Sequence, residues 1–456
     1  MKLTLGQIAD YIHAEGDFNE DAEAYGYSID SRTLNAGDLF FAVKGDRVDG
    51  HEYVGAALAN GAAGCVVSNH WLAPDEMDQS KLLWVPESED CVLKAMQTLA
   101  HAVRRRWGKR VIAITGSAGK TTTKEAIATV LCAKFNILKS AGNLNNHFGV
   151  PLQLLRLEPE HELAVIEMGM NHAGEIAELC RIAEPNWGVV SNVGTAHIEF
   201  FPDGIEGIAA AKYELVQALP TDGLAILNAD DEHVARFAAN LGDRAVLYGV
   251  SPAAQIRAED IVETGTDGIR FSAISPGENA AVTLHMLGRH NVSNALAAIA
   301  VGITAGIRIA DCAAAIATLR APEKRGEIIH LRGATLINDC YNSNPAALDA
   351  MVDALLSIPA KRHIVVAGEM LELGDSADEL HRKCGTKMAA KSIDLVLGVR
   401  GHAAALVEAA GANAIYVDTP AEAGAWLAAN LREGDAVLLK ASRGVRLEAA
   451  LAILLI

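Results

Sequence analysis

Two glycines, a lysine and a run of threonines follow a short apolar stretch of this sequence, in the order Val111-Ile112-Ala113-Ile114-Thr115-Gly116-Ser117-Ala118-Gly119-Lys120-Thr121-Thr122. A strand that turns through glycines into a helix presents backbone N–H groups and a helix N-terminus to phosphate groups. The Lys120 ammonium can neutralise those phosphates, and the Thr121 hydroxyl can reach Mg²⁺. The pattern therefore predicts an ATP-binding loop at residues 116–122; the alternative is a glycine-rich turn that carries a lysine by chance.

The spacing of the glycines distinguishes this loop from the common phosphate loop of NTPases. The common loop has its first glycine at the position that Ile114 holds here, whereas this chain has Gly116 and Gly119. A shortened T-G-x-x-G-K-T loop is uncommon among general NTPases. It resembles the loop of the ATP-dependent Mur ligases and of the folylpolyglutamate synthetases.

Polar residues follow two further predicted strands. Glu167 ends the strand predicted over 163–167, and His197 follows the strand predicted over 187–192. Because the carboxyl ends of parallel strands open onto the ligand crevice, we expect Glu167 beside the phosphate loop as a Mg²⁺ ligand. The alternatives are a charge at a helix N-terminus for Glu167 and a structural role for His197.

Three more polar residues lie in predicted helices. Lys212 belongs to an otherwise apolar helix over 204–218, where a surface lysine with a packed aliphatic stem is the simple interpretation. Asn291 and Asn294 open a later helix, and their spacing puts both amides on one face. There they can bind a nucleotide base or cap neighbouring backbone groups.

Composition restricts the classes of partner. The net charge of −18 argues against a nucleic-acid surface. No segment has the roughly 18 continuous apolar residues that a bilayer-spanning helix requires. The seven cysteines are scattered and never in C-x-x-C spacing, and the N-terminus lacks the apolar core of a signal peptide. We therefore expect a cytoplasmic protein without a membrane span.

The 456 residues indicate about three domains of an α/β protein. We place them at 1–85, 86–320 and 321–456. Strand and helix alternate from residue 111 to about 318, which predicts parallel strands with crossover helices, and they alternate again after Pro322. The second series resembles a doubly wound domain of Rossmann type without a G-x-G-x-x-G motif. The clearest strands are predicted at 111–115, 163–167, 187–192, 224–228, 335–339, 363–367, 394–397 and 436–440.

Taken together, the motifs resemble those of the Mur ligase family in order and spacing, from about residue 28 to 446. The resemblance implies a UDP-substrate domain, a central P-loop ATPase domain with a mainly parallel sheet, and a C-terminal Rossmann-like domain. It is strongest to the members that add D-alanyl-D-alanine, and the D-N-P-R signature of the members that add diaminopimelate is absent. The motifs are Thr115 to Glu125, Ala141 to Asn146, Glu167-Met168-Gly169, Asn171-His172, His197, Lys212, Gly288 to Asn294, Asp339 to Pro345 and Gly368 to Gly374.

The resemblance implies roles for the polar residues of the phosphate site. Thr121 and Glu167 would hold one Mg²⁺, and His197 with Glu167 another. Lys212 resembles the family lysine that reacts with CO₂ to give a metal-binding carbamate, so we expect Lys120, Lys212, His197 and Glu167 to be catalytic. The nucleotide would be bound by residues 116–122 and by Asn291, Asn294, Arg325 and Asp339. For Arg325 and Asp339 the alternative is a solvated ion pair between domains.

The substrate residues also follow from the resemblance. Residues 28–32 and 37–45 match the family segment that binds uridine diphosphate. One departure from the family pattern is Lys440-Ala441-Ser442-Arg443, where relatives carry K-G-S-R. The expected substrate-binding residues are Ser28, Asp30, Ser31, Arg32, Lys44, Gly45, Asn143, Asn145, Asn146, Asn171, His172, Tyr341, Asn342, Ser442 and Arg443.

The expected reaction joins UDP-N-acetylmuramoyl-tripeptide to D-alanyl-D-alanine through an acyl phosphate, at the expense of ATP, in a monomer. The sequence leaves open whether the third residue of the tripeptide is diaminopimelate or lysine. Two alternatives remain. One is another amide ligase of the superfamily, either the Mur ligase that adds diaminopimelate or a folylpolyglutamate synthetase. The other is a switch protein that hydrolyses ATP without making a bond.

Overall fold

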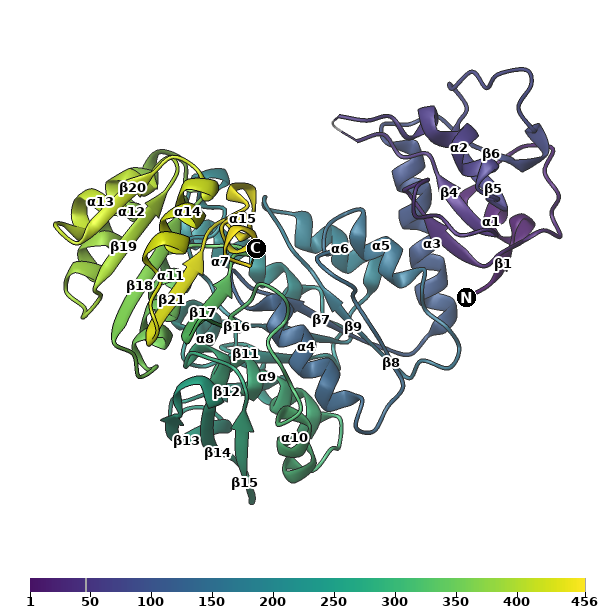
Figure 1. Cartoon of the computed structure of the whole chain (residues 1–456). Helices are drawn as coiled ribbons and strands as arrows, with labels where there is room; N and C mark the ends of the chain where they lie inside the picture. The colour runs from purple at the N-terminus through teal and green to yellow at the C-terminus, as the bar shows by residue number, and fades with distance from the viewer. Residues whose placement is uncertain (46, 456) are drawn as a thin grey trace.

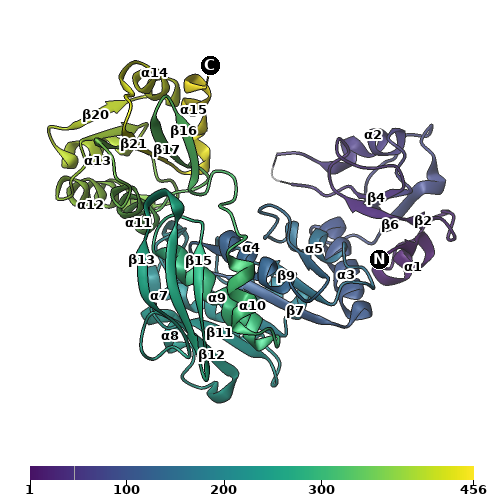
Figure 2. The same cartoon turned by 60° about the horizontal axis from the view of Figure 1, so that its bottom comes forward.

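The computed structural model describes residues 1–45 and 47–455, and its strands fall into three main sheets in the order of the chain. Figures 1 and 2 show these sheets as three units, with the N-terminal and C-terminal units at opposite ends of the central one. The boundaries near residues 85 and 320 stay a proposal; they lie between the last strand of one sheet and the first strand of the next.

The N-terminal unit contains a four-stranded parallel sheet in the order β3-β4-β5-β6. Helix α1 (Leu5–Ile12) precedes it, and its start is fixed by a capping box between Thr4 and Gln7. The elements are β1 (Leu3–Thr4), β2 (Glu23–Ala24), β3 (Gly26–Ser28), β4 (Asp38–Phe41), α2 (Val54–Ala59), β5 (Gly64–Ser68) and β6 (Leu82–Val85).

Helix α3 (Cys91–Trp107) leads into the central sheet, which has nine strands in the order β15-β14-β13-β12-β11-β10-β7-β9-β8. The strands from β8 to β13 pair in parallel, as predicted. Residues 111–115 of β7 are buried, because helices cover both faces of the sheet. The strands are β7 (Arg110–Thr115), β8 (Ile137–Lys139), β9 (Leu163–Glu167), β10 (Trp187–Val190), β11 (Leu224–Asn228), β12 (Ala245–Gly249), β13 (Ile256–Glu263), β14 (Ile269–Ser275) and β15 (Glu278–Leu284).

One edge of the central sheet differs from the predicted alternation of strand and helix. Strands β13, β14 and β15 pair antiparallel, with a register shift between Glu259 and Val262. Buried and more exposed residues alternate along β14, as in a strand with only one covered face. The helices of this unit are α4 (Lys120–Leu131), α5 (Gly149–Leu154), α6 (Glu175–Ala183), α7 (Gly204–Gln217), α8 (Glu232–Arg236), α9 (His290–Thr304) and α10 (Ile309–Ile316).

The C-terminal unit contains a six-stranded sheet in the order β16-β17-β21-β18-β19-β20. Its strands are parallel except β16, which pairs antiparallel with β17. Asn344 and Thr419 cap α11 and α14, which both begin with a proline. The elements are β16 (Glu327–Leu331), β17 (Ala334–Asp339), α11 (Pro345–Leu356), β18 (Arg362–Gly368), α12 (Ala377–Ala389), β19 (Leu395–Val399), α13 (Ala403–Ala410), β20 (Ala414–Val417), α14 (Pro420–Asn430), β21 (Asp435–Lys440) and α15 (Glu448–Leu454).

Within residues 1–45 and 47–455, no helix combines the length and the apolar character that crossing a membrane requires.

Three arginines, Arg104 to Arg106, lie in the last turn of α3, and the first of them has a structural role. The guanidinium of Arg104, which is 5% exposed, donates to the carbonyls of Ala183 (2.7 Å) and Glu184 (2.9 Å) and to Asn186 Oδ1 (3.2 Å). It thereby satisfies acceptors at the C-terminus of α6. The side chain of its neighbour Arg105 is 68% exposed.

We expect Arg104→Met to lower the free energy of unfolding by about 1–3 kcal/mol, because one buried and two part-buried hydrogen bonds from a charged donor are lost. Chemical denaturation followed by fluorescence measures the change. The matched control is Arg105→Met, which removes an exposed guanidinium and is expected to leave the transition where it is. Equal effects of the two substitutions would contradict the structural role of Arg104.

Candidate active site

The predicted phosphate loop connects β7 to α4. A Cβ atom at Gly116 would lie 1.9 Å from Ser191 Oγ, and Gly119 has a φ of +78° with Asn294 Oδ1 2.8 Å from the position of its Cβ. Only glycine fits both positions. No side chain caps the N-terminus of α4. The N–H groups of its first turn therefore remain available to an anion.

Asn192 is a residue of this loop region that the sequence interpretation missed. The N–H groups of Ser117 and Ala118 donate to its carbonyl oxygen (3.0 Å) and to its Oδ1 (2.9 Å), and its Nδ2 donates to Ala118 O at 2.8 Å. The amides of two predicted ATP-binding positions thus hold the loop against the end of β10. The sequence signal was present, since Asn192 ends the strand predicted over 187–192.

Lys120 lies over the loop that it follows. Its Nζ donates to Gly116 O at 2.7 Å. Burial lowers the pKa of this ammonium and nearby Arg325 lowers it further, whereas the Glu167 carboxylate opposes both effects. Lys120, Arg325 and Glu167 therefore act on one another electrostatically beside the N-terminus of α4.

Glu167 and Thr121 lie together, as predicted for a Mg²⁺ site. Thr121 Oγ1 donates to Glu167 Oε1 at 3.3 Å, and Asn145 Nδ2 donates to the same oxygen at 2.8 Å. Glu167 is 2% exposed, and its Oε2 accepts no hydrogen bond from the described residues. Oε2 lies 3.4 Å from Lys124 Nζ. A buried carboxylate beside a hydroxyl fits the oxygen ligands that Mg²⁺ prefers. The described residues contain no group of three or more His, Cys, Asp or Glu side chains that could hold a metal ion.

His197 pairs with the C-terminal unit. Its Nδ1 lies 2.6 Å from Glu372 Oε2, and His197 lowers the pKa of that carboxyl group. Glu372 belongs to the motif Gly368 to Gly374, which had no assigned role. In this arrangement His197 contacts a carboxylate of another unit, so a shared metal with Glu167 stays a prediction.

Lys212 is buried in α7 and is 2% exposed, so the interpretation as a surface lysine is wrong. Burial lowers the pKa of its amine well below the ordinary value, and the charge of Lys120 lowers it further. A buried lysine under these conditions favours the neutral, nucleophilic form.

Arg325 and Asp339 have separate partners, and neither forms an ion pair between units among the described residues. Arg325 Nη2 donates to Thr121 Oγ1 at 3.1 Å, and its guanidinium lies 3.9 Å from the centre of the Tyr341 ring. Asp339 pairs with the buried Lys440, whose Nζ also donates to Asn342 O at 2.9 Å. Arg325 thus brings the C-terminal unit to the predicted metal ligand Thr121.

Asn291 and Asn294 form a buried chain of hydrogen bonds between α9 and α4. Thr123 Oγ1 donates to Asn294 Oδ1 (3.0 Å), Asn294 Nδ2 to Asn291 Oδ1 (2.8 Å), and Asn291 Nδ2 to Leu287 O (2.7 Å). The Asn291 amide thus contacts a backbone carbonyl, as in the capping alternative, whereas the Asn294 amide contacts two side chains. Their contact with a nucleotide stays a prediction.

The predicted uridine residues form a cluster in the N-terminal unit. Arg32 makes a two-point contact with Asp30, at 2.9 and 2.7 Å, which lowers the pKa of Asp30 to about 2. Ser28 Oγ donates to Asp30 O, and Asn60 Nδ2 donates to Ser31 O. Lys44 and Gly45 lie in a separate loop, where Gly45 N donates to Val48 O at 2.9 Å.

The remaining predicted substrate residues lie in loops near the phosphate loop and in the C-terminal unit. Asn146 Oδ1 accepts from Gly149 N before α5, and Asn171 N and His172 Nδ1 contact Glu175 at the start of α6. Ser442 Oγ accepts from Leu371 N, and Arg443 pairs with Glu448. A contact with substrate stays a prediction for Asn143, Asn145, Asn146, Asn171, His172, Tyr341, Asn342, Ser442 and Arg443.

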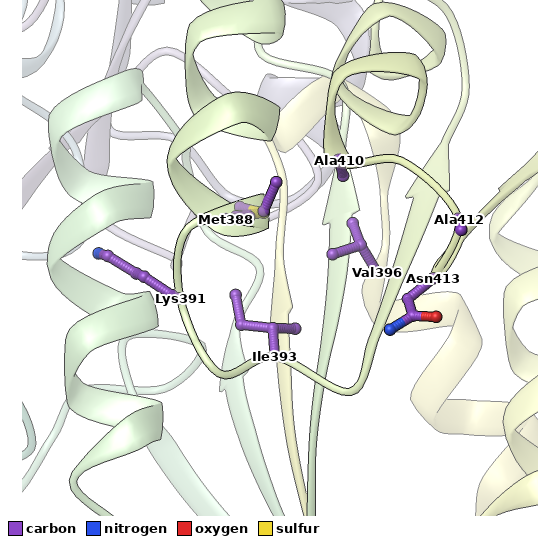
Figure 3. A pocket seen from close by; sticks show the side chains of 8 residues that line it. Met388, Lys391, Ile393, Val396, Ala410, Ala412 and Asn413 are labelled. Carbon is purple, nitrogen blue, oxygen red and sulfur yellow. The ribbon is translucent and has the colours of Figure 1, made fainter.

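Two pockets lie away from these residues. Figure 3 shows the first, of about 140 Å³, which Met388, Lys391, Ile393, Val396 and Asn413 help to line in the C-terminal unit. A shallow groove of about 520 Å³ lies between α4, β8 and α10 and includes Cys132. Neither contains a predicted site residue, so the candidate active site remains the region around the phosphate loop.

Comparisons with known proteins cover the whole chain. Three family models match: "Mur ligase family, catalytic domain" at residues 23–97, "Mur ligase middle domain" at 114–302 and "Mur ligase, glutamate ligase domain" at 324–443. Two relatives are named UDP-N-acetylmuramoyl-tripeptide–D-alanyl-D-alanine ligase. The Escherichia coli protein is 37% identical over 92% of this chain and 91% of its own length; the Bacillus subtilis protein is 34% identical over 98% and 97%.

Solved structures agree with these matches. A crystal structure of MurF from Acinetobacter baumannii has a TM-score of 0.90 at 29% identity and covers 100% of this chain and 99% of its own. The structure of the MurF ligase from Thermotoga maritima in complex with ADP has a TM-score of 0.82 at 28% identity and covers 94% and 96%. Together with the identity to the relatives over nearly the whole length, these findings establish that the chain belongs to the Mur ligase family.

Proposed function

We propose that this chain is an ATP-dependent ligase that adds D-alanyl-D-alanine to UDP-N-acetylmuramoyl-tripeptide in peptidoglycan synthesis. The observation that carries the proposal is the buried Glu167 carboxylate beside Thr121 at the end of the phosphate loop. It occurs in a chain that aligns almost from end to end with relatives of that name.

The reaction must bring two anions together, a peptide carboxylate and the γ-phosphate of ATP. Positive charge has to offset their repulsion, and residues fixed before the reaction do so without reorganisation. We assign the phosphates to Lys120 and to the amides at the start of α4, with Arg325 reaching the same region from the C-terminal unit. Thr121 and Glu167 would hold Mg²⁺, which when bound supplies Lewis-acid polarisation of the phosphoryl oxygens.

Lys212 is proposed to carry a carbamate. Its neutral amine would form an N–C bond with CO₂ and release a proton to solvent, which turns a neutral amine into an anionic oxygen ligand. Burial and the nearby Lys120 charge support the assignment, because both favour an amine that is not protonated. His197 is proposed as a further metal ligand once its contact with Glu372 is broken.

The carboxylate of the tripeptide would then attack the γ-phosphate to give an acyl phosphate and ADP. The free amine of D-alanyl-D-alanine attacks the acyl carbon and expels phosphate. We assign the nucleotide to Asn291, Asn294, Arg325 and Asp339, which come from two units. Closure of these units over ATP would exclude water and protect the acyl phosphate from hydrolysis.

We further infer a cytoplasmic, monomeric enzyme. The described cysteines are free thiols, which agrees with a reducing compartment.

We expect phosphate release from ATP and Mg²⁺ to require both UDP-N-acetylmuramoyl-tripeptide and D-alanyl-D-alanine. The mass of the nucleotide product should rise by the added dipeptide, with lysine-containing and diaminopimelate-containing tripeptides tested in parallel. Controls replace the dipeptide by D-alanine or by diaminopimelate. Release that is indifferent to the dipeptide would favour an ATP-hydrolysing switch, and extension by a single amino acid would favour a neighbouring ligase.

For Lys212 we expect a carbamate resonance in the ¹³C NMR spectrum of the protein in ¹³C-bicarbonate, and its loss in Lys212→Ala. Since a metal-binding group is removed, kcat should fall by roughly tenfold to a hundredfold. Lys134→Ala, which removes an exposed lysine that donates to Gly306 O, is the control and should keep the resonance. A spectrum that is the same in wild type and Lys212→Ala would rule the carbamate out.

A further inference from the structure

Lys124 is a fully buried cation without a role in the site described so far. It lies in α4, one helical turn beyond Lys120, and its side chain is 0% exposed. Lysines are almost never fully buried unless they are paired. Its surroundings must therefore compensate the charge.

Three groups surround the Lys124 ammonium. Its Nζ donates to Gly142 O at 3.0 Å and lies 3.4 Å from Glu167 Oε2 and 3.5 Å from Glu125 Oε1. The other oxygen of Glu125 pairs with Lys139, which is half exposed. Lys124 thus links α4 to the end of β9 and to the loop that begins at residue 141.

The same loop contacts Glu167 a second time. Asn145 Nδ2 donates to Glu167 Oε1 at 2.8 Å, and Gly169 N donates to Asn145 O at 2.8 Å. A Cβ atom at Gly169 would lie 2.8 Å from Asn145 Oδ1, so the loop packs tightly against the segment after β9. One oxygen of Glu167 therefore faces Asn145, and the other faces the cation that binds the loop at Gly142.

We propose that Lys124 is a positioning residue that fixes the Glu167 carboxylate and the loop of residues 141–146 in a single arrangement. The order of the loop and the orientation of the carboxylate then depend on each other. The inference rests on the proposed function, which assigns Mg²⁺ to Glu167 and substrate to Asn143, Asn145 and Asn146. Through Lys124, binding of Mg²⁺ at Glu167 and binding of substrate at the loop of residues 141–146 affect each other.

The physical reason is the cost of removing the cation. Without Lys124, Glu167 remains as a buried charge that has lost its nearest cation, and Gly142 O loses its donor. The carboxylate is then free to turn toward Thr121 and the remaining cations, and the loop is free to leave α4. Residues that orient metal ligands typically change metal affinity or activity by about 10–100-fold when they are removed.

The experiment compares Lys124→Met, which keeps the aliphatic volume without the charge, with Lys139→Met, which removes the exposed lysine on the other oxygen of Glu125. Lys124→Gln, a shorter neutral donor, is studied in parallel and replaces Lys124→Met if that variant does not fold. Hydrogen exchange of residues 141–149 is measured in the nucleotide-free protein. ADP binding is then titrated against Mg²⁺ concentration, and each variant's thermal transition is recorded.

We expect faster exchange of residues 141–149 and an increase of about tenfold or more in the Mg²⁺ concentration needed for ADP binding in the Lys124 variant, with Lys139→Met unchanged. A lower thermal transition with wild-type exchange and wild-type Mg²⁺ dependence would overturn the proposal and leave Lys124 a packing residue. Exchange in the free protein does not depend on the reaction. A wild-type enzyme without dipeptide-dependent phosphate release would therefore contradict the proposed function separately.

Discussion

The burial of the Glu167 carboxylate is the constraint on which the phosphate site depends. A carboxylate that is only 2% exposed costs several kcal/mol unless cations and hydrogen bonds compensate it. The compensation comes from two different segments: Thr121 and Lys124 of α4, and Asn145 of the loop that begins at residue 141. The phosphate helix, the loop and β9 are therefore held in one arrangement by a single acid, and each contributes a residue that the proposed chemistry uses.

Cations outnumber anions around this acid. Burial and the charge of Arg325 lower the pKa of Lys120, and burial and the charge of Lys120 lower the pKa of Lys212. A local excess of positive charge in a chain with a net charge of −18 is costly by itself and is relieved by a bound polyphosphate. Conversion of the Lys212 amine to a carbamate would relieve it further, because an anion would replace a neutral amine.

Much of the fold and part of the site could be predicted from the sequence. Long apolar runs followed by polar residues identified β7, β9 and β10, and the rule that parallel strands open at their carboxyl ends placed Glu167 beside Thr121. The antiparallel strands β13 to β15 were missed, since their alternating pattern interrupts the repeat of strand and helix on which the prediction relied. The role of Asn192 and the contact of His197 with Glu372 depend on tertiary packing between distant segments, which local patterns do not specify.

The C-terminal unit contacts the phosphate site, whereas the N-terminal unit lies away from it. Arg325 and Glu372 already connect the C-terminal unit to Thr121 and His197, whereas Figure 2 shows the N-terminal unit at the opposite end of the central sheet. The cluster of Ser28, Asp30 and Arg32 therefore lies apart from the phosphate loop. A substrate with a nucleotide at one end and a peptide carboxylate at the other has one group for the N-terminal cluster and another for the phosphate loop. Binding at the N-terminal cluster would then restrict where the carboxylate can reach, so that recognition and phosphoryl transfer are separated in space and connected by the substrate itself.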